Sequence, residues 1–164
     1  STALQDTMAH TIKAVGEKLA ALPEDQRPGQ VIFCVVTDGE ENMSKEYGGE
    51  RGRLAVAEMI KHQTEVYSWD FIYLGANQDA VQVGASYGIA SANALTYAAS
   101  DAGVDVMFRS VSDNVKSYRS SRSKRDIAFS AVQRKQAIDP DVITSTGKVA
   151  SLSDLAKAID DASK

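Results

Sequence analysis

A continuous run of apolar residues, followed at once by a polar turn, is the feature of this 164-residue chain that most limits its fold. The run covers residues 31–36, Val-Ile-Phe-Cys-Val-Val, and Thr37, Asp38 and Gly39 end it. β-Branched and aromatic residues without polar alternation are typical of a strand buried on both faces, as in a parallel sheet. Because ligands of such sheets bind beyond the carboxyl ends of the strands, Asp38 is placed where it can bind a divalent cation or a cationic group of a partner. The alternative is that Asp38 only caps the turn.

Helical and strand-like patterns alternate along much of the remaining chain. Apolar residues recur at spacings of three and four in the helical segments, whereas β-branched and aromatic residues gather in the strand-like ones. The predicted helices cover 2–22, 53–64, 79–87 and 104–118, and the predicted further strands cover 69–75 and 94–97. This order predicts an α/β fold, with a mainly parallel sheet and helices on both of its faces.

A basic stretch from Lys116 to Arg125 contains five cations and no acid, and we place the end of the core near it. Such a run beside Tyr118 can bind nucleic acid by neutralising phosphates and stacking a base. We favour a solvated helix end instead, since cations suit the last turn of a helix and the net charge of −4 gives no general attraction to nucleic acid. Nucleic acid is therefore not among the partners that we expect.

Three stretches together resemble the von Willebrand factor A (vWA) family, in its bacterial and phage-encoded branch. Residues 35–42, Val-Val-Thr-Asp-Gly-Glu-Glu-Asn, resemble the family's strand and loop that end in Thr-Asp-Gly. Residues 1–6 resemble its Gly-x-Thr-x-Leu-x-Asp helix start, and residues 69–77 resemble its next core strand. The resemblance implies a Rossmann-like vWA fold, with a partial vWA domain over 1–120 and a mostly helical C-terminal tail over 121–164.

The same resemblance implies a metal-ion-dependent adhesion site (MIDAS). In the family, Mg²⁺ or another divalent cation is held by an Asp-x-Ser-x-Ser loop, by the Thr of the helix start and by the Asp of Thr-Asp-Gly. The matching residues here are Thr2 and Asp38, and no Asp-x-Ser-x-Ser occurs in the chain. We therefore expect magnesium binding to be weak or absent in this chain alone.

The missing motif also implies that the fold is N-terminally incomplete. Either the first strand was truncated or cleaved, or another chain supplies it. In both cases the strand from Val31 lacks a neighbour and is expected to expose an apolar edge that something must cover.

Three further polar residues follow in the same loop, and they have two interpretations. Glu40, Glu41 and Asn42 either tune the metal site and contact a basic partner, or form a solvated acidic turn. His10 and His62 fall on separate predicted helices without a second ligand at metal spacing, so we expect surface or packing roles for them. The sequence carries no motif of a nucleophile, zinc enzyme or phosphate-binding loop, and we predict that the protein is not an enzyme.

The function that we predict is a protein-binding module with a divalent-cation adhesion site at the C-terminal edge of the sheet. A partner carboxylate would complete the metal shell. The alternative is a structural component of a bacterial or phage (virion) assembly with a non-functional metal site, which assembles with itself or with a chain that supplies the missing strand.

No stretch approaches the roughly 18 apolar residues of a spanning helix, so no membrane contact is expected. We expect a cytoplasmic location in a bacterial host, or the virion, and a buried Cys34 thiol.

Overall fold

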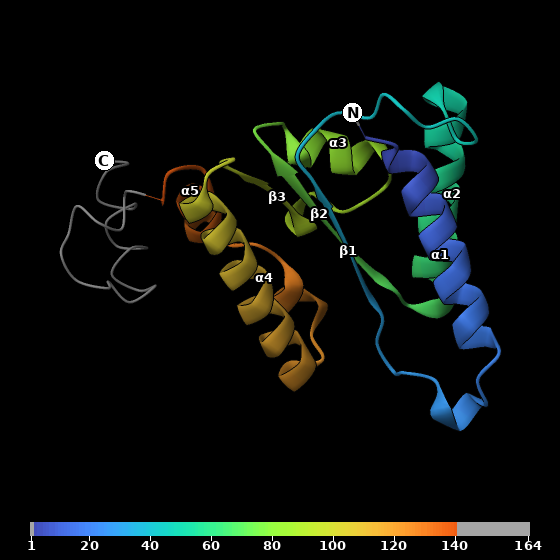
Figure 1. Cartoon of the computed structure of the whole chain (residues 1–164). Helices are drawn as coiled ribbons and strands as arrows, with labels where there is room; N and C mark the ends of the chain where they lie inside the picture. The colour runs from blue at the N-terminus through green and yellow to red at the C-terminus, as the bar shows by residue number, and fades with distance from the viewer. Residues whose placement is uncertain (1, 141–164) are drawn as a thin grey trace. The chain divides into compact units, whose positions relative to one another are not determined.

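The computed structural model describes residues 2–140 of the chain, so the predicted terminal helix over 152–162 lies outside the described residues. Helices and strands alternate as the sequence predicted. They are α1 (Leu4–Ala20), β1 (Ile32–Thr37), α2 (Gly49–Tyr67), β2 (Asp70–Ala76), α3 (Ala80–Ser86), β3 (Ala94–Tyr97), α4 (Asp101–Ser121) and α5 (Ala131–Ile138), with short 3₁₀ turns η1 (Glu24–Gln26), η2 (Ser91–Asn93) and η3 (Lys124–Ile127) (Figure 1).

The three strands form a parallel sheet in the order β1-β2-β3, flanked by helices, which confirms the α/β class. The register of β1 on β2 runs from Ile32 opposite Asp70 to Thr37 opposite Gly75. Parallel strands need a crossover between them, and the 19-residue helix α2 provides it here. Each residue of β2 is buried, as expected for the central strand of a covered parallel sheet.

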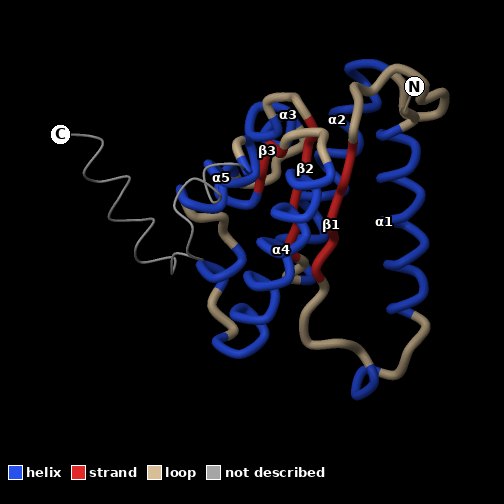
Figure 2. Tube along the Cα trace, turned by 60° about the vertical axis from the view of Figure 1, so that its left-hand side comes forward, coloured by secondary structure: helices blue, strands red, loops and turns tan. Residues whose placement is uncertain are grey.

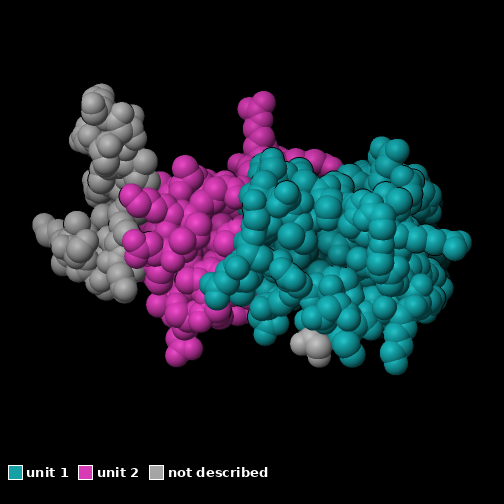
Figure 3. Space-filling view, turned by 90° about the horizontal axis from the view of Figure 1, so that it is seen from above, with its two compact units in different colours: residues 1–94 teal, residues 95–164 magenta. Residues whose placement is uncertain are grey.

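The chain divides into two compact units, residues 1–94 and 95–164 (Figure 3). In unit 1, one face of the sheet packs against α1 and α2. The side chains that form this core are buried to 5% exposure or less and include Leu4, Met8, Ile12, Val56, Ile60, Phe71 and Tyr73. Burying an aliphatic or aromatic side chain of this kind contributes about 1.5–3 kcal/mol, so this stripe fixes both helices on the sheet.

Unit 2 is built from α4, η3 and α5, and a buried polar pair joins them. The Gln133 side-chain nitrogen donates to Asn114 Oδ1 at 2.7 Å, and Asn114 Nδ2 donates to the carbonyl of Ala128 at 3.1 Å. Ser130 caps α5 in a capping box with Gln133. The described part of the predicted tail, residues 121–140, contains η3 and α5.

The Cys34 side chain corrects one expectation. An apolar run that is buried on both faces predicts a buried thiol, but Cys34 is exposed. The reason is that successive side chains of a strand lie on opposite faces of the sheet. Val35 and Thr37 lie on the buried face of β1, whereas Cys34 and Val36 lie on the opposite, exposed face. Within residues 2–140, no helix is long and apolar enough to cross a membrane.

Candidate functional site at the carboxyl end of β1

The loop of residues 38–48 follows β1 and is bound to the start of α1 by the carboxylate of Asp6. Backbone nitrogens of Lys45 and Tyr47 donate to this carboxylate at 2.8 and 2.7 Å. These two hydrogen bonds are the main reason that the pKa of Asp6 lies below its usual value. Asp6 also sits in the first turn of α1, where a negative charge suits the helix dipole. The loop therefore has a fixed position on unit 1.

Glu41 makes a second connection between this loop and α1. One carboxylate oxygen accepts the backbone N–H of Gln5 at 2.7 Å, and the other accepts the backbone N–H groups of Met43 and Ser44 at 3.0 and 2.8 Å. Desolvation of Glu41 raises its pKa, but these hydrogen bonds outweigh it and the net shift is downward. Both oxygens of Glu41 thus serve to order the loop.

Thr2 lies against the same loop through its backbone. Its carbonyl accepts the N–H groups of Asn42 and Met43, both at 3.2 Å, and its own N–H donates to Asn42 Oδ1 at 3.1 Å. The Thr2 hydroxyl is near the turn after β1, because a Cβ added at Gly39 would lie 3.5 Å from it. The structure therefore brings Thr2 beside the turn that carries Asp38, although the two are 36 positions apart in sequence.

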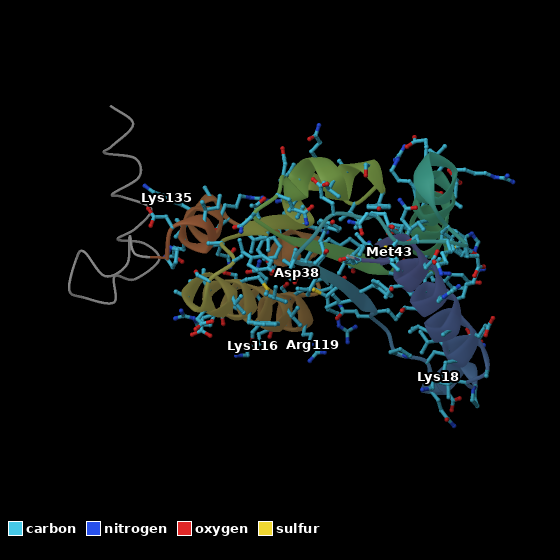
Figure 4. The ribbon with its side chains drawn as sticks, turned by 45° about the horizontal axis from the view of Figure 1, so that its top comes forward. Lys18, Asp38, Met43, Lys116, Arg119 and Lys135 are labelled. Atoms are coloured by element: carbon cyan, nitrogen blue, oxygen red, sulfur yellow. The ribbon has the colours of Figure 1, made fainter. Side chains whose placement is uncertain are left out.

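The turn itself depends on Thr37, the last residue of β1. The Thr37 hydroxyl donates to the carbonyl of Gly39 at 2.8 Å, and the Gly39 N–H donates back to it at 3.3 Å. Thr37 is buried, whereas Asp38 is exposed on the loop that also carries Met43 (Figure 4). The backbone turns sharply at a buried residue and leaves the next carboxylate in solvent.

The side-chain oxygens at this site suit a hard divalent cation as ligands, but they are few. Mg²⁺ takes about six oxygen ligands in octahedral geometry. Asp38 offers a carboxylate and Thr2 a hydroxyl, while the side-chain oxygens of Glu41 and Asn42 are already hydrogen-bonded to backbone N–H groups. Residues 2–140 contain no group of three or more His, Cys, Asp or Glu side chains arranged to hold a metal. Oxygen ligands from outside these residues would have to fill most of the coordination shell of the cation.

The backbone of β1 forms an open edge that leads directly to Asp38. The N–H of Asp70 donates to the carbonyl of Val31 at 2.9 Å, and the parallel ladder therefore directs the odd-numbered residues of β1 toward β2. Ile32, Cys34 and Val36 direct their N–H and C=O groups to the other side, where no strand of the described chain pairs with them (Figure 2). Val36 is 47% exposed. The edge is apolar, extended and free of charged residues.

The histidines and the cations of the basic run lie on the surface of the described chain. The His10 ring is exposed and lies 2.7 Å from the carboxylate of Glu46, and the His62 ring makes an edge contact with Tyr67. In unit 2, Lys116 and Arg119 are exposed on α4 (Figure 4), but Tyr118 is only 3% exposed and its ring cannot stack on a base.

No protein-family model, curated protein or solved structure matches this chain.

Proposed function

We propose that this chain is a protein-binding module of partial vWA fold, which receives an extended segment of its partner along the open edge of β1. The observation that carries the proposal is the row of backbone groups at Ile32, Cys34 and Val36, with which no strand in residues 2–140 pairs. Adding a strand satisfies such groups by main-chain hydrogen bonds, and pockets for alternate side chains then give specificity. The chemistry is recognition and involves no turnover.

A divalent cation would strengthen this contact at the end of the edge. Mg²⁺ would be held by the Asp38 carboxylate and the Thr2 hydroxyl, and a carboxylate of the partner would add a further ligand. The exposure of Asp38 and the position of Thr2 beside Gly39 support this arrangement. With two donors in the described residues, we expect cation binding to be weak until the partner is present.

A proline substitution tests strand addition without breaking the existing sheet. The N–H of Cys34 is directed away from β2, so Cys34→Pro removes one donor of the open edge and leaves the β1-β2 ladder intact. Peptides selected from a random displayed library against the purified chain serve as the probe. We expect selected peptides to bind the chain and its Cys34→Ser variant equally, and to lose at least about tenfold in affinity for Cys34→Pro. Undiminished binding to Cys34→Pro, or a failure to select any peptide, would contradict the proposal.

The cation is tested separately by titrating the chain with Mg²⁺ and following its amide NMR signals. We expect shifts at Thr2 and Gly39 that Asp38→Ala removes and that Glu40→Ala, an exposed acid in the same loop, leaves unchanged. Equal shifts in both variants would show that the cation binds the acidic loop without using Asp38.

A second candidate is a structural component of a bacterial or phage assembly that associates with itself. The same edge favours it, because two copies of β1 can pair antiparallel about Cys34, with Ile32 of one copy opposite Val36 of the other. Sedimentation velocity distinguishes the two candidates. A concentration-dependent dimer that Cys34→Pro abolishes supports self-assembly, and a monomer at high concentration contradicts it.

We infer a cytoplasmic location in a bacterial host for the first candidate and the virion for the second.

A further inference from the structure

Unit 1 also contains a cavity, and side chains line it where the open edge of β1 offers backbone groups. A cavity of about 680 Å³ lies between the C-terminal halves of α1 and α2, above the residues that lead into β1 and β2. Leu19 lines it from α1, Met59 from α2, and Val31 and Trp69 from the starts of the two strands. The lining includes none of the outward-directed edge residues Ile32, Cys34 and Val36, and none of the residues considered for the cation, Thr2, Asp38, Glu40, Glu41 and Asn42.

The cavity exists because the apolar stripe of α1 continues beyond the part that the core covers. Leu4, Met8 and Ile12 are exposed by 5%, 2% and 1%, whereas Val15 and Leu19 further along the same stripe are only partly buried. Apolar side chains that are left partly uncovered between two helices form a site for another apolar group.

The volume of this space suits one small molecule. Ligand pockets in proteins have volumes of about 300–1,000 Å³ and are lined mainly by apolar side chains with a few polar groups. Trp69 lines the cavity and is itself only 3% exposed. The side-chain amide of Gln63 also lines the cavity, and within residues 2–140 it makes no hydrogen bond to another group, so it can bind one polar group of a ligand.

The charges at the rim balance and give an anionic ligand no net attraction. The cations Arg27 and Lys13 line the cavity and are held by hydrogen bonds to neutral groups, Arg27 to the carbonyls of Ala20 and Leu22 and Lys13 to the Tyr47 hydroxyl. The exposed carboxylates of Glu17 and Glu58 lie on the same rim and oppose them, and the His62 ring lines the cavity beside them. A neutral ligand has no charge to leave uncompensated at such a rim.

We propose that this cavity is a binding site for a neutral, mainly apolar small molecule, which packs on Trp69 between Leu19 and Met59. A single hydrogen-bonding group of the ligand contacts the Gln63 amide. The site is independent of the protein-binding function, because it uses neither the edge of β1 nor Asp38.

Two substitutions at Gly16 provide a matched test. Gly16 lines the cavity from α1, and a Cβ there would meet only the Gln63 side chain, at 3.8 Å. The Cβ of either variant is therefore accommodated. The longer side chain of Gly16→Leu is expected to occupy the cavity, and Gly16→Ala is the control that leaves most of the volume free. The probe is N-phenyl-1-naphthylamine, which is neutral and fluoresces when it is buried. Trp69 is the only tryptophan of the chain, so its fluorescence reports the same event from the protein side.

We expect saturable binding of this probe with quenching of Trp69, retained in Gly16→Ala and weakened at least about tenfold in Gly16→Leu. The anionic analogue 1-anilinonaphthalene-8-sulfonate is expected to bind less tightly than the neutral probe. The proposal is overturned if the neutral probe does not saturate, if Gly16→Leu binds it as well as Gly16→Ala, or if the anionic analogue binds better. Circular dichroism of both variants verifies their fold. If Gly16→Leu is unfolded, Met59→Phe, which fills the cavity from α2 and adds no tryptophan, replaces it.

Discussion

The Asp6 carboxylate accepts the backbone N–H of Tyr47 at 2.7 Å and thereby binds the first turn of α1 to the loop that follows β1. Since this bond and that from Lys45 favour the charged carboxylate, the pKa of Asp6 in the folded chain is below its unfolded value of 3.8. A group with a depressed pKa stabilises the fold above its unfolded pKa, and this contribution is lost as the pH falls through the folded pKa.

We therefore expect Asp6→Ala to reduce stability at neutral pH, and the difference from the unsubstituted chain to shrink below a pH of about 4. Urea unfolding followed across this range measures it. Asp25→Ala in η1 is the control, because within residues 2–140 its carboxylate accepts no hydrogen bond. A stability difference for Asp6→Ala that stays constant down to the lowest pH would contradict the assignment.

Glu41 and Glu40 are adjacent acids with different surroundings, and this difference gives a second prediction. Glu41→Ala leaves the N–H groups of Gln5, Met43 and Ser44 without their acceptor, so we expect it to cost about 2 kcal/mol in the free energy of unfolding. Glu40→Ala removes an exposed side chain and is expected to change it by less than about 0.5 kcal/mol. Chemical denaturation of both variants compares them, and equal losses would refute the role given to Glu41.

Several features of the fold were predictable because they leave a local pattern. The apolar runs before Asp38 and Gly75 predict β1 and β2, and the spacing of Leu4, Met8 and Ile12 predicts the buried face of α1. The proximity of Thr2 to the turn after β1 came from the family resemblance alone.

Other features depend on contacts between distant positions and leave no such pattern. The carboxylate of Asp6 binds residues about 40 positions away, and no spacing rule connects them. Glu41 was considered for the metal or for a partner, yet its hydrogen bonds are internal. The start of α2 at Gly49, four residues before the predicted start, depends on the close packing of Gly52 against the Tyr47 carbonyl.

Two glycines within helices are expected to respond to alanine in opposite directions. At Gly16 a Cβ has room, and replacing glycine inside a helix stabilises it, so we expect Gly16→Ala to raise the free energy of unfolding by about 0.5–1 kcal/mol. At Gly52 a Cβ would lie 1.9 Å from the carbonyl oxygen of Tyr47, and the backbone would have to move. We expect Gly52→Ala to cost about 2 kcal/mol. Thermal unfolding of the two variants measures both signs, and stabilisation by Gly52→Ala would show that the loop before α2 is not closely packed.

The Cys34 thiol is exposed on β1, but partial desolvation by its neighbours raises its pKa to about 11. Because the thiolate is the reactive form, we expect slow alkylation by iodoacetamide at neutral pH. The rate should rise about tenfold for each unit of pH until the pH nears the pKa. Mass spectrometry of the single cysteine follows the reaction, with free cysteine as the reference. A plateau at about pH 9 would mean that the thiol is as well solvated as that of free cysteine.

The Asn114–Gln133 pair in unit 2 is expected to hold α4, η3 and α5 together. Both side chains are buried, at 8% and 9% exposure, and Asn114→Ala removes the acceptor of the Gln133 amide and the donor to the Ala128 carbonyl. Leaving buried polar groups unpaired costs about 1–3 kcal/mol, so we expect a loss of about 2–3 kcal/mol for this variant. Ser112→Ala, on the exposed side of α4, is the control. Amide hydrogen exchange locates the effect: faster exchange in α5 than in α1 is expected, since the pair lies within unit 2. Equal acceleration in both helices would instead mean that the two units unfold as one.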